Sequence, residues 1–330
     1  MLTMTYSFPI RPRRLRATES IRSMVQESRL HPSDFVLPIF ISDEGQVTEI
    51  PSMPGVFRWP IDQLSSHIAS CANLGIRAFA LFPKIASGLK TPNGDEILNP
   101  KSLVYRAAKS LKALDSNLVL IADLALDPYT SHGQDGILLE NGYVGNDETV
   151  EILAKASLVC ANAGFDWVAP SDMMDGRVAI IRKTLDQNSH FNTGIISYSA
   201  KFASSYYGPF RSAIDSSPNG QQVDKSTYQL NPANFKEAKR ELHLDYDEGA
   251  DMLMVKPAEP FLDIINYAKT NFDIPIAAYQ VSGEYSRIMA ANQLGWLDWK
   301  MCAHESLLSI KRAGASVIFS YFADKIAPLL

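Results

Sequence analysis

Two lysines are the residues of this sequence whose placement points most directly to covalent chemistry. Lys256 closes the almost wholly apolar segment "GADMLMVKP", and Lys201 follows the apolar segment "GIISYSA". Such runs are typical of strands buried in a parallel sheet, so each lysine is expected at the carboxyl end of its strand. An ammonium that reaches water past the strand explains a single lysine of this kind. Two lysines in matching positions predict a shared cavity.

A shared cavity changes what the two amines can do. Two ammonium groups in one poorly hydrated pocket disfavour each other's charge, and burial lowers the pKa of an amine further. At least one lysine is then expected to be a neutral amine near pH 7, able to attack a ketone and form a Schiff base. Ion pairs with nearby aspartates are the alternative, and for either lysine alone they are the better explanation. The pair at two strand ends favours chemistry.

The segments that position these lysines belong to a regular alternation of strands and helices. Helical patterns lie between most of eight apolar segments that are rich in β-forming residues. This alternation predicts a (β/α)8 TIM barrel, with a doubly wound open sheet as the competing arrangement, and the count of eight favours the barrel. The predicted strands cover residues 35–41, 78–83, 118–127, 166–170, 194–200, 252–257, 274–282 and 316–323.

The domain organisation predicted from this pattern is an N-terminal arm, residues 1–34, followed by a catalytic barrel, residues 35–330. The arm holds a basic stretch that leads into a predicted helix. A targeting peptide is one interpretation, but the segment runs straight into the barrel, which favours an arm that clasps another subunit.

Composition limits the partners and the compartment. The chain has 330 residues, of which 46% are hydrophobic and 20% charged, with a formal net charge of −5. These values are typical of a globular protein with a large core and give no indication of a nucleic-acid partner. Its apolar runs are far shorter than the roughly 20 residues that span a bilayer. We therefore expect a cytoplasmic protein with no membrane or nucleic-acid partner.

A long connection follows Lys201 and covers residues 202–232. A connection of this length in a compact barrel usually acts as a lid or a binding loop, although disorder is an alternative. Arg211 and Lys225 are the cations that it could bring over the site. Either could clamp a substrate carboxylate, whereas a solvated surface charge is the usual fate of a loop cation.

Six segments carry a resemblance to a known family. They are "ISYSAKFASSYYGPFR", "GADMLMVKPAEPFLDII", "PSDMMDGRVAIIR", "ESLLSIKRAGASVIFSYFA", "RPRRLR" and "SMPGVFR". They resemble the delta-aminolevulinic acid dehydratases, also called porphobilinogen synthases, and the likeness covers nearly the whole chain. It implies a (β/α)8 barrel and a lyase of heme and other tetrapyrrole biosynthesis. This lyase condenses two molecules of 5-aminolevulinate into porphobilinogen with loss of two waters.

The resemblance also implies a role for each lysine. Lys256 would hold the substrate that becomes the propionate side of the product, and Lys201 the one that becomes the acetate side, each as a Schiff base. A protonated imine is an electron sink that permits loss of a proton from the adjacent carbon. Two ketones need two amines, which agrees with the pair of strand-end lysines.

Two carboxylates likewise need two anchors. By resemblance, Arg211 and Lys225 bind the carboxylate of the second substrate, and Ser282 and Tyr321 bind that of the first. This division places a cationic anchor under the lid and a hydroxyl anchor on the seventh and eighth predicted strands.

The segment after the third predicted strand, "DLALDPYTSHGQDG", departs from the better-known pattern. Many members of the family bind a catalytic zinc here through three cysteines, whose positions hold Ala125, Asp127 and Asp135. Carboxylates do not make a thiolate zinc site, so no zinc is expected. The chain resembles the family's aspartate-rich, magnesium-responsive branch, in which Asp123, Asp127 and Asp135 would orient the second amino group and assist proton transfer. His132 could be a base or an ordinary loop histidine.

The resemblance further implies an allosteric Mg²⁺ at Glu241 and a homo-octamer built from dimers. A glutamate on a charged helix is by itself a weak signal, although Mg²⁺ often keeps several waters and needs few protein ligands. Asp127 and Asp135 are alternative ligands for an active-site cation, either magnesium or a monovalent ion.

Two other functions stay open at this point. One is an aldolase-type barrel that uses a single lysine on another keto substrate. The other is a catalytically silent, oligomeric binding protein, against which the two lysines and the lid cations argue.

Overall fold

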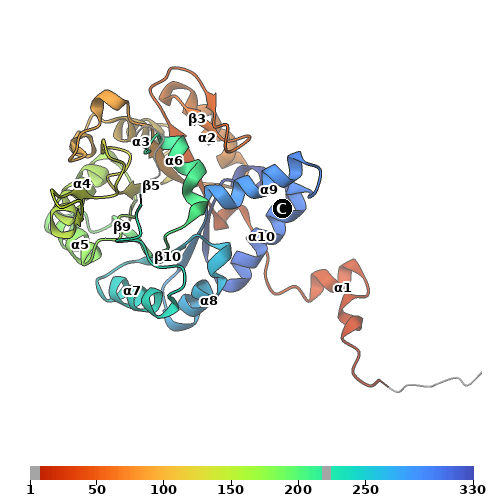
Figure 1. The fold of residues 1–330 in the computed structure, drawn as a ribbon. Coiled ribbons are helices and arrows are strands. Elements are labelled where there is room, and N and C mark those ends of the chain that lie inside the picture. Colours follow the sequence, from red (N-terminus) through yellow and green to blue (C-terminus); the bar gives the residue numbers. More distant parts are fainter. Residues whose placement is uncertain (1–7, 218–223) are drawn as a thin grey trace, which may run out of the picture.

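Eight parallel strands close into a barrel in this computed structural model, which describes residues 8–217 and 224–330. The closing contact pairs the first barrel strand with the last, Phe35 with Ile318 and Val36 with Phe319. Figure 1 shows helices surrounding the strands. The predicted barrel is confirmed and the open sheet is excluded. The barrel strands are β1 (Phe35–Ile41), β4 (Ala78–Pro83), β5 (Val119–Leu124), β8 (Trp167–Pro170), β9 (Gly194–Lys201), β10 (Met252–Lys256), β11 (Ile276–Gln280) and β12 (Val317–Ser320).

Helices cover the barrel, which explains why most residues of its strands are apolar. Every residue of β1, β10 and β11 is buried, as expected for strands that pack a barrel interior on one face and helices on the other. The main helices are α2 (Ile61–Asn73), α3 (Leu103–Leu114), α4 (Asn146–Ala163), α5 (Arg177–Gln187), α7 (Phe235–Asp247), α8 (Leu262–Asn271), α9 (Ser282–Gln293) and α10 (Trp299–Ala313). The sequence analysis does not predict α3, which follows a long irregular connection after β4.

Three small additions flank the barrel. β2 (Thr48–Glu49) and β3 (Phe57–Trp59) extend the sheet beside β1. β6 (Ile137–Leu138) and β7 (Val144–Gly145) form a separate hairpin before α4, and α6 (Gly208–Ile214) lies in the predicted lid. Residues 218–223 of that lid lie outside the described part of the chain.

The third barrel strand is shorter than the sequence pattern predicts. β5 ends at Leu124, where its ladder with β8 pairs Leu124 with Pro170. The chain then turns, because the amides of Tyr129 and Thr130 both donate to the carbonyl of Leu126. Asp127 therefore lies in a turn beyond the strand, not on the strand itself.

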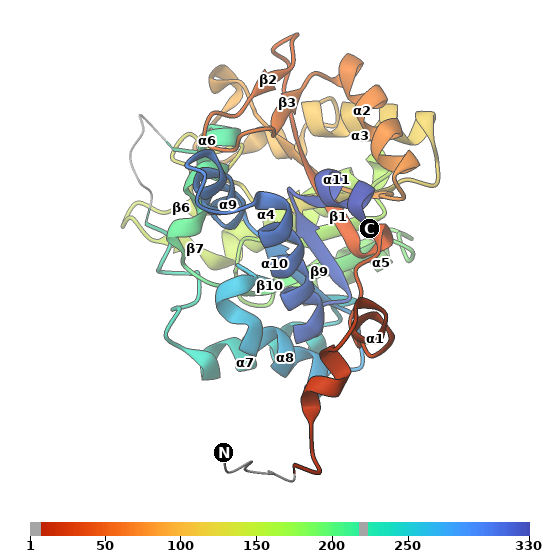
Figure 2. The same ribbon diagram turned by 90° about the vertical axis from the view of Figure 1, so that its right-hand side faces the viewer.

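The N-terminal segment extends away from the barrel. It contains the 3₁₀ helix η1 (Pro12–Arg16) and α1 (Glu19–Met24), neither of which has a buried residue. Figures 1 and 2 show this segment projecting from one side of the barrel. Within the described residues, none of the helices combines the length and the apolar character needed to cross a bilayer.

Candidate active site

Lys201 and Lys256 are the last residues of neighbouring strands. β9 and β10 run parallel in a register that places the two lysines opposite each other, and each lysine is only 6% exposed. Neighbouring strands lie about 4.8 Å apart, so the two side chains begin side by side. They lie at the carboxyl end of the barrel strands, where barrel enzymes carry their active sites.

Aromatic rings surround the ammonium of Lys256. Its Nζ lies 4.6 Å from the ring centre of Tyr279, 4.9 Å from Tyr198, 5.3 Å from Tyr207 and 5.4 Å from Phe210. None of the described carboxylates forms an ion pair with it. Burial and the charge of Lys201 together lower the pKa of this amine to about 7, although the charges of nearby aspartates oppose the shift. Near neutral pH a large fraction of Lys256 is therefore an uncharged nucleophile.

Lys201 lies in a different environment, in contact with carbonyl and carboxylate oxygens. Its Nζ donates to Asp135 Oδ2 at 3.0 Å and to the carbonyl oxygen of Ser171. Lys225 donates to the other oxygen of Asp135 and lies 3.5 Å from Asp127 Oδ2. Burial alone would raise the pKa of Asp135, but the charges of Lys201 and Lys225 hold it at about 2. Lys201 is thus an ion-paired ammonium beside a carboxylate.

Asp127, which is buried, and Asp123, which is partly buried, also lie beside the lysines. Burial raises the pKa of Asp123 to about 6, although the charge of Lys256 opposes the shift. One of its oxygens, Oδ1, has no hydrogen-bond partner among the described residues. Burial also raises the pKa of Asp127, against the charge of Lys225. Asp123 can therefore exchange a proton near neutral pH and still offer a free acceptor to a bound molecule.

The two hydroxyl residues lie on the other side of Lys256, at the ends of the next strands. Ser282 follows β11, accepts a hydrogen bond from the amide of Phe210 at 3.0 Å and donates to the carbonyl of Tyr206 at 3.2 Å. Tyr321 follows β12, and its hydroxyl lies 3.0 Å from that of Tyr279. The lid backbone therefore rests directly on Ser282.

The two lid cations occupy different positions. Lys225 is 6% exposed, and burial lowers its pKa less than Asp127 and Asp135 raise it. It is a buried cation and not a solvated surface charge. Arg211 lies on α6, half-buried, and makes no ion pair with the described residues. Its charge acts on Lys225, so the two cations share one region above the aspartates.

Comparison of the chain with known proteins shows which family it belongs to. The sequence profile of delta-aminolevulinic acid dehydratase matches residues 9–329. The chain belongs to the delta-aminolevulinic acid dehydratase family. The expected lyase, which condenses two molecules of 5-aminolevulinate into porphobilinogen in tetrapyrrole synthesis, is thereby confirmed, and the single-lysine aldolase and the silent binding protein lose their support.

Three similar proteins illustrate the match. A delta-aminolevulinic acid dehydratase of Chlamydia pneumoniae is 49% identical over 97% of this chain and 96% of its own length. A chloroplastic dehydratase of Physcomitrium patens is also 49% identical, over 98% of this chain and 74% of its own length. A crystal structure of the Toxoplasma gondii enzyme with its product porphobilinogen superposes with a TM-score of 0.96 at 44% identity, covering 98% of this chain and 92% of that one.

Some of the aromatic residues around Lys256 come from the lid. The sequence analysis assigned no role to these residues. Tyr207 and Phe210 belong to the segment "YYGPF" after β9, and Tyr207 also donates hydrogen bonds to the carbonyls of Phe202 and Lys256. The signal that pointed to them is the concentration of aromatic side chains in a segment expected to cover the site. These rings, with Tyr198 from β9, exclude water from the amine.

Glu241 lies on α7, away from the lysines. It lines a pocket of about 220 Å³ together with Glu237 and Asp175. Burial and the charge of Asp245 together raise its pKa to about 7. Such concentrated negative charge fits a hydrated Mg²⁺ ion. No three His, Cys, Asp or Glu side chains of the described chain converge tightly enough to hold a metal, so an ion here would keep several of its waters.

The carboxylates of the segment after β5 could bind a cation, but an ammonium group of the protein already contacts them. The ammonium of Lys225 bridges Asp127 and Asp135, so a cation at that position would displace it. His132 makes two contacts with the main chain: Nε2 donates to the carbonyl of Pro92 at 3.0 Å, and Nδ1 accepts from the amide of Gln134 at 3.2 Å. This arrangement favours the loop-histidine alternative over a base.

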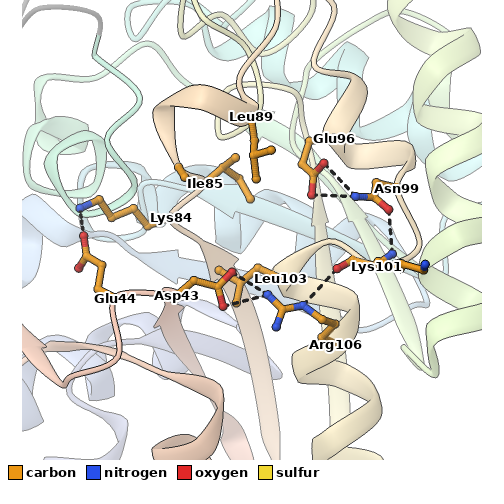
Figure 3. Close-up of a pocket in the computed structure, with 11 residues that line it drawn as sticks. Asp43, Glu44, Lys84, Ile85, Leu89, Glu96, Asn99, Lys101, Leu103 and Arg106 are labelled. Atoms are coloured by element: carbon orange, nitrogen blue, oxygen red, sulfur yellow. Dashed lines mark hydrogen bonds and ion pairs between the residues drawn. The ribbon is translucent and has the colours of Figure 1, made fainter.

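Another pocket, of about 310 Å³, is lined by the residues shown in Figure 3. It lies beside the loops that follow β1 and β4, and neither lysine lines it. Four of its six charged side chains are already paired, because Arg106 contacts Asp43 at 2.6 Å and Lys84 contacts Glu44. A substrate carboxylate would compete with these internal pairs, so the two buried lysines mark the better site.

Proposed function

We propose that this chain performs its family's reaction with Lys256 and Lys201 as two Schiff-base nucleophiles. The observation that carries the proposal is the pairing of two buried amines at the last position of neighbouring barrel strands. In the overall reaction, two molecules of 5-aminolevulinate give one porphobilinogen and two waters. Two amines in one cavity can activate both ketones and hold them within reach of each other.

Lys256 acts on the substrate that becomes the propionate side. Its neutral amine attacks the ketone carbon, and the carbinolamine loses water to give an imine. Protonation of the imine nitrogen makes the imine carbon an electrophile. The carbon next to the ketone of the acetate-side substrate, after it has lost a proton, attacks this carbon, and the propionate chain stays intact. Ser282 and Tyr321 bind the carboxylate of this substrate, supported by their positions at the ends of the next two strands. Ser282 then exchanges its lid contacts for the substrate.

Lys201 acts on the substrate that becomes the acetate side. Its ammonium must first lose a proton, and the neighbouring carboxylates of Asp135 and Asp123 are the groups placed to receive or relay it. Arg211 and Lys225 bind the second carboxylate. Asp127 belongs to the same carboxylate group and helps to orient the second amino group.

We assign the chain to the zinc-independent, magnesium-responsive branch of the family. Support comes from the segment after β5, where Ala125, Asp127 and Asp135 occupy the cysteine positions. Mg²⁺ binds at Glu241 as an allosteric ion, where it would supply positive charge to a carboxylate cluster on α7. A monovalent ion at Asp127 and Asp135 is the remaining alternative for an active-site cation.

We further propose a homo-octamer whose N-terminal arms, residues 1–34, each embrace a neighbouring catalytic barrel, residues 35–330. Ile10, Leu15 and Met24 on the arm are 82%, 55% and 74% exposed. Apolar side chains in this arrangement are expected to be covered by another copy of the chain. We also propose a cytoplasmic location, in line with the composition of the chain.

One experiment tests the chemistry directly. The purified protein is incubated with 5-aminolevulinate, porphobilinogen is measured colorimetrically, and a second sample is reduced with borohydride before peptide mapping. We expect product and adducts at both Lys201 and Lys256. An adduct at one lysine without porphobilinogen would support the aldolase-type alternative, and neither product nor adduct would support a binding protein.

A further inference from the structure

Glu284 is a fully buried carboxylate that the proposed reaction does not use. It lies in the first turn of α9 with 0% exposure, and no cation of the described chain forms an ion pair with it. Three backbone amides donate to it instead: Val281 at 2.6 Å, Glu259 at 2.6 Å and Ala258 at 3.4 Å. Burial without a cation raises the pKa of this carboxyl to about 8, and the amides of Val281 and Ala258 oppose the shift because they favour its ionised form. The positions of its three hydrogen-bond partners therefore indicate the structural role of Glu284.

These partners lie on two different strand exits. Ala258 and Glu259 follow Lys256, the proposed nucleophile, while Val281 directly precedes Ser282, the proposed carboxylate anchor. The ladder between β10 and β11 ends with the pair of Val255 and Ala278. Beyond that point the sheet no longer fixes the two exits to each other. Glu284 does so in its place.

A second set of contacts extends this connection to the other anchor. Gln280 donates to Glu259 Oε1 at 3.2 Å, and Ser320 donates to Gln280 Oε1 at 2.6 Å. Ser320 directly precedes Tyr321. Side-chain hydrogen bonds therefore join the exits of β10, β11 and β12, with the Glu284 carboxylate as the central acceptor for the first two.

We propose that Glu284 is a positioning residue that fixes the span between Lys256 Nζ and Ser282 Oγ. This inference rests on the proposed function. A keto acid held through its ketone and its carboxylate must have a carbon chain that matches this span. A displacement of about 1 Å can cost on the order of 10²-fold in rate, so a rigid span makes the site selective for keto-acid length. Glu284 thus determines specificity without touching the substrate.

The hydrogen bonds of Glu284 can be tested by a substitution that changes only its ability to accept them. Both oxygens of Glu284 accept hydrogen bonds, Oε1 from Glu259 and Oε2 from Val281 and Ala258. In Glu284→Gln one oxygen becomes an NH₂ group, which faces a backbone N–H and cannot accept from it. The substitution keeps the shape of the side chain. Whichever oxygen is replaced, one of the two 2.6 Å hydrogen bonds that link the strand exits is lost, and at most the 3.4 Å contact with Ala258 remains on the β10 side of the link. Glu305→Gln, at an exposed position on α10, is the matched control.

The test compares two ligands that differ by one methylene, 4-oxopentanoate and 5-oxohexanoate. Their dissociation constants are measured from borohydride trapping at Lys256 in the wild-type full chain and in both variants. We expect the wild type and Glu305→Gln to prefer 4-oxopentanoate by roughly 10-fold or more. In Glu284→Gln we expect the preference to fall to about threefold or less, with a raised KM for 5-aminolevulinate.

Each outcome separates this inference from the proposed function. An unchanged preference in Glu284→Gln overturns the positioning role, whereas a wild-type protein that forms no adduct at Lys256 overturns the proposed function itself. Because both ligands are measured on one sample, the ratio does not depend on the fraction of folded protein. If Glu284→Gln yields no folded protein, Glu284→Asp keeps both acceptors, draws them back by one methylene and is judged by the same ratio.

Discussion

Lys256 lies opposite Lys201 on the neighbouring strand, yet Lys201 is held by a carboxylate and Lys256 by aromatic rings. The same functional group is therefore present in two environments. Burial among Tyr198, Tyr207 and Tyr279 lowers the pKa of one amine, while Asp135 compensates the charge of the other. When the environments of two paired titratable groups differ in this way, the difference indicates which chemical role each group has.

Lys256→Ala is expected to abolish porphobilinogen formation. Loss of the amine removes one of two covalent nucleophiles, and we expect kcat/KM to fall by about 10³-fold or more. Product formation is measured with 5-aminolevulinate as substrate. Lys183→Ala, at an exposed position on α5, is the control and should keep the parent rate. Turnover by Lys256→Ala near the parent rate would refute the nucleophilic role.

The pH dependence of adduct formation reports on the same amine. Since the pKa of Lys256 is lowered to about 7, the neutral fraction should rise about tenfold per unit below pH 7 and level off above it. The rate of borohydride-trapped adduct formation with 4-oxopentanoate measures this profile.

Removal of the neighbouring charge should move that profile. In Lys201→Met the midpoint is expected to shift upward, because the charge of Lys201 lowers the pKa of Lys256 and the released charge of Asp135 acts in the same direction. Lys183→Met should leave it unchanged. A midpoint near the ordinary lysine pKa in the wild type would contradict the burial argument.

The elements that the sequence predicted correctly are those whose structure follows from a single strong pattern, the burial of apolar residues. The barrel strands are buried on both faces, so their apolar runs and their number indicate the barrel, and strand ends place Lys201 beside Lys256. Helix α3 was missed because the irregular connection before it gives no clear start signal. The end of β5 was misplaced because apolar residues continue into a turn.

The different environments of the two lysines could not be predicted. They depend on side chains that distant segments bring to each amine: Tyr207 and Phe210 from the lid to Lys256, and Asp135 from the segment after β5 to Lys201. The role proposed for Glu284 likewise depends on backbone amides from two strand exits. Hydrogen bonds to the backbone leave no sequence pattern, since any residue can provide the amide.

Zinc removal is expected to leave catalysis largely intact. The segment after β5 presents Ala125, Asp127 and Asp135 where a thiolate site would need cysteines, and hard carboxylates do not replace that site. Activity is measured after treatment with a zinc-selective chelator, with buffered Mg²⁺ present throughout. Strong inhibition that only added zinc reverses would show that the chain needs zinc after all.

Glu241→Ala should remove stimulation by Mg²⁺ without removing basal activity. The carboxyl has a pKa raised to about 7 by burial, and a bound cation would favour its ionised form. Stimulation in the parent should therefore weaken as pH falls through about 7, because protons compete for the same oxygen atoms. Asp247→Ala, exposed on the same helix, is the control. A Mg²⁺ titration that is unchanged in Glu241→Ala would count against this site.

Arg177→Met is expected to lower stability strongly, because Arg177 is the cation of a buried network behind Lys201. Its guanidinium contacts Asp245 at 3.1 Å and 3.2 Å, Asp172 at 3.6 Å and Ser197 at 3.2 Å, all of them buried. Removal of one partner leaves buried carboxylates uncompensated, which costs about 3–5 kcal/mol in the free energy of unfolding. Urea unfolding measures the loss, and Lys183→Met on the same helix is the control. A loss below about 1 kcal/mol would mean that the carboxylates accept protons at little cost, as the pKa of Asp172, raised to about 6 by burial, would then permit.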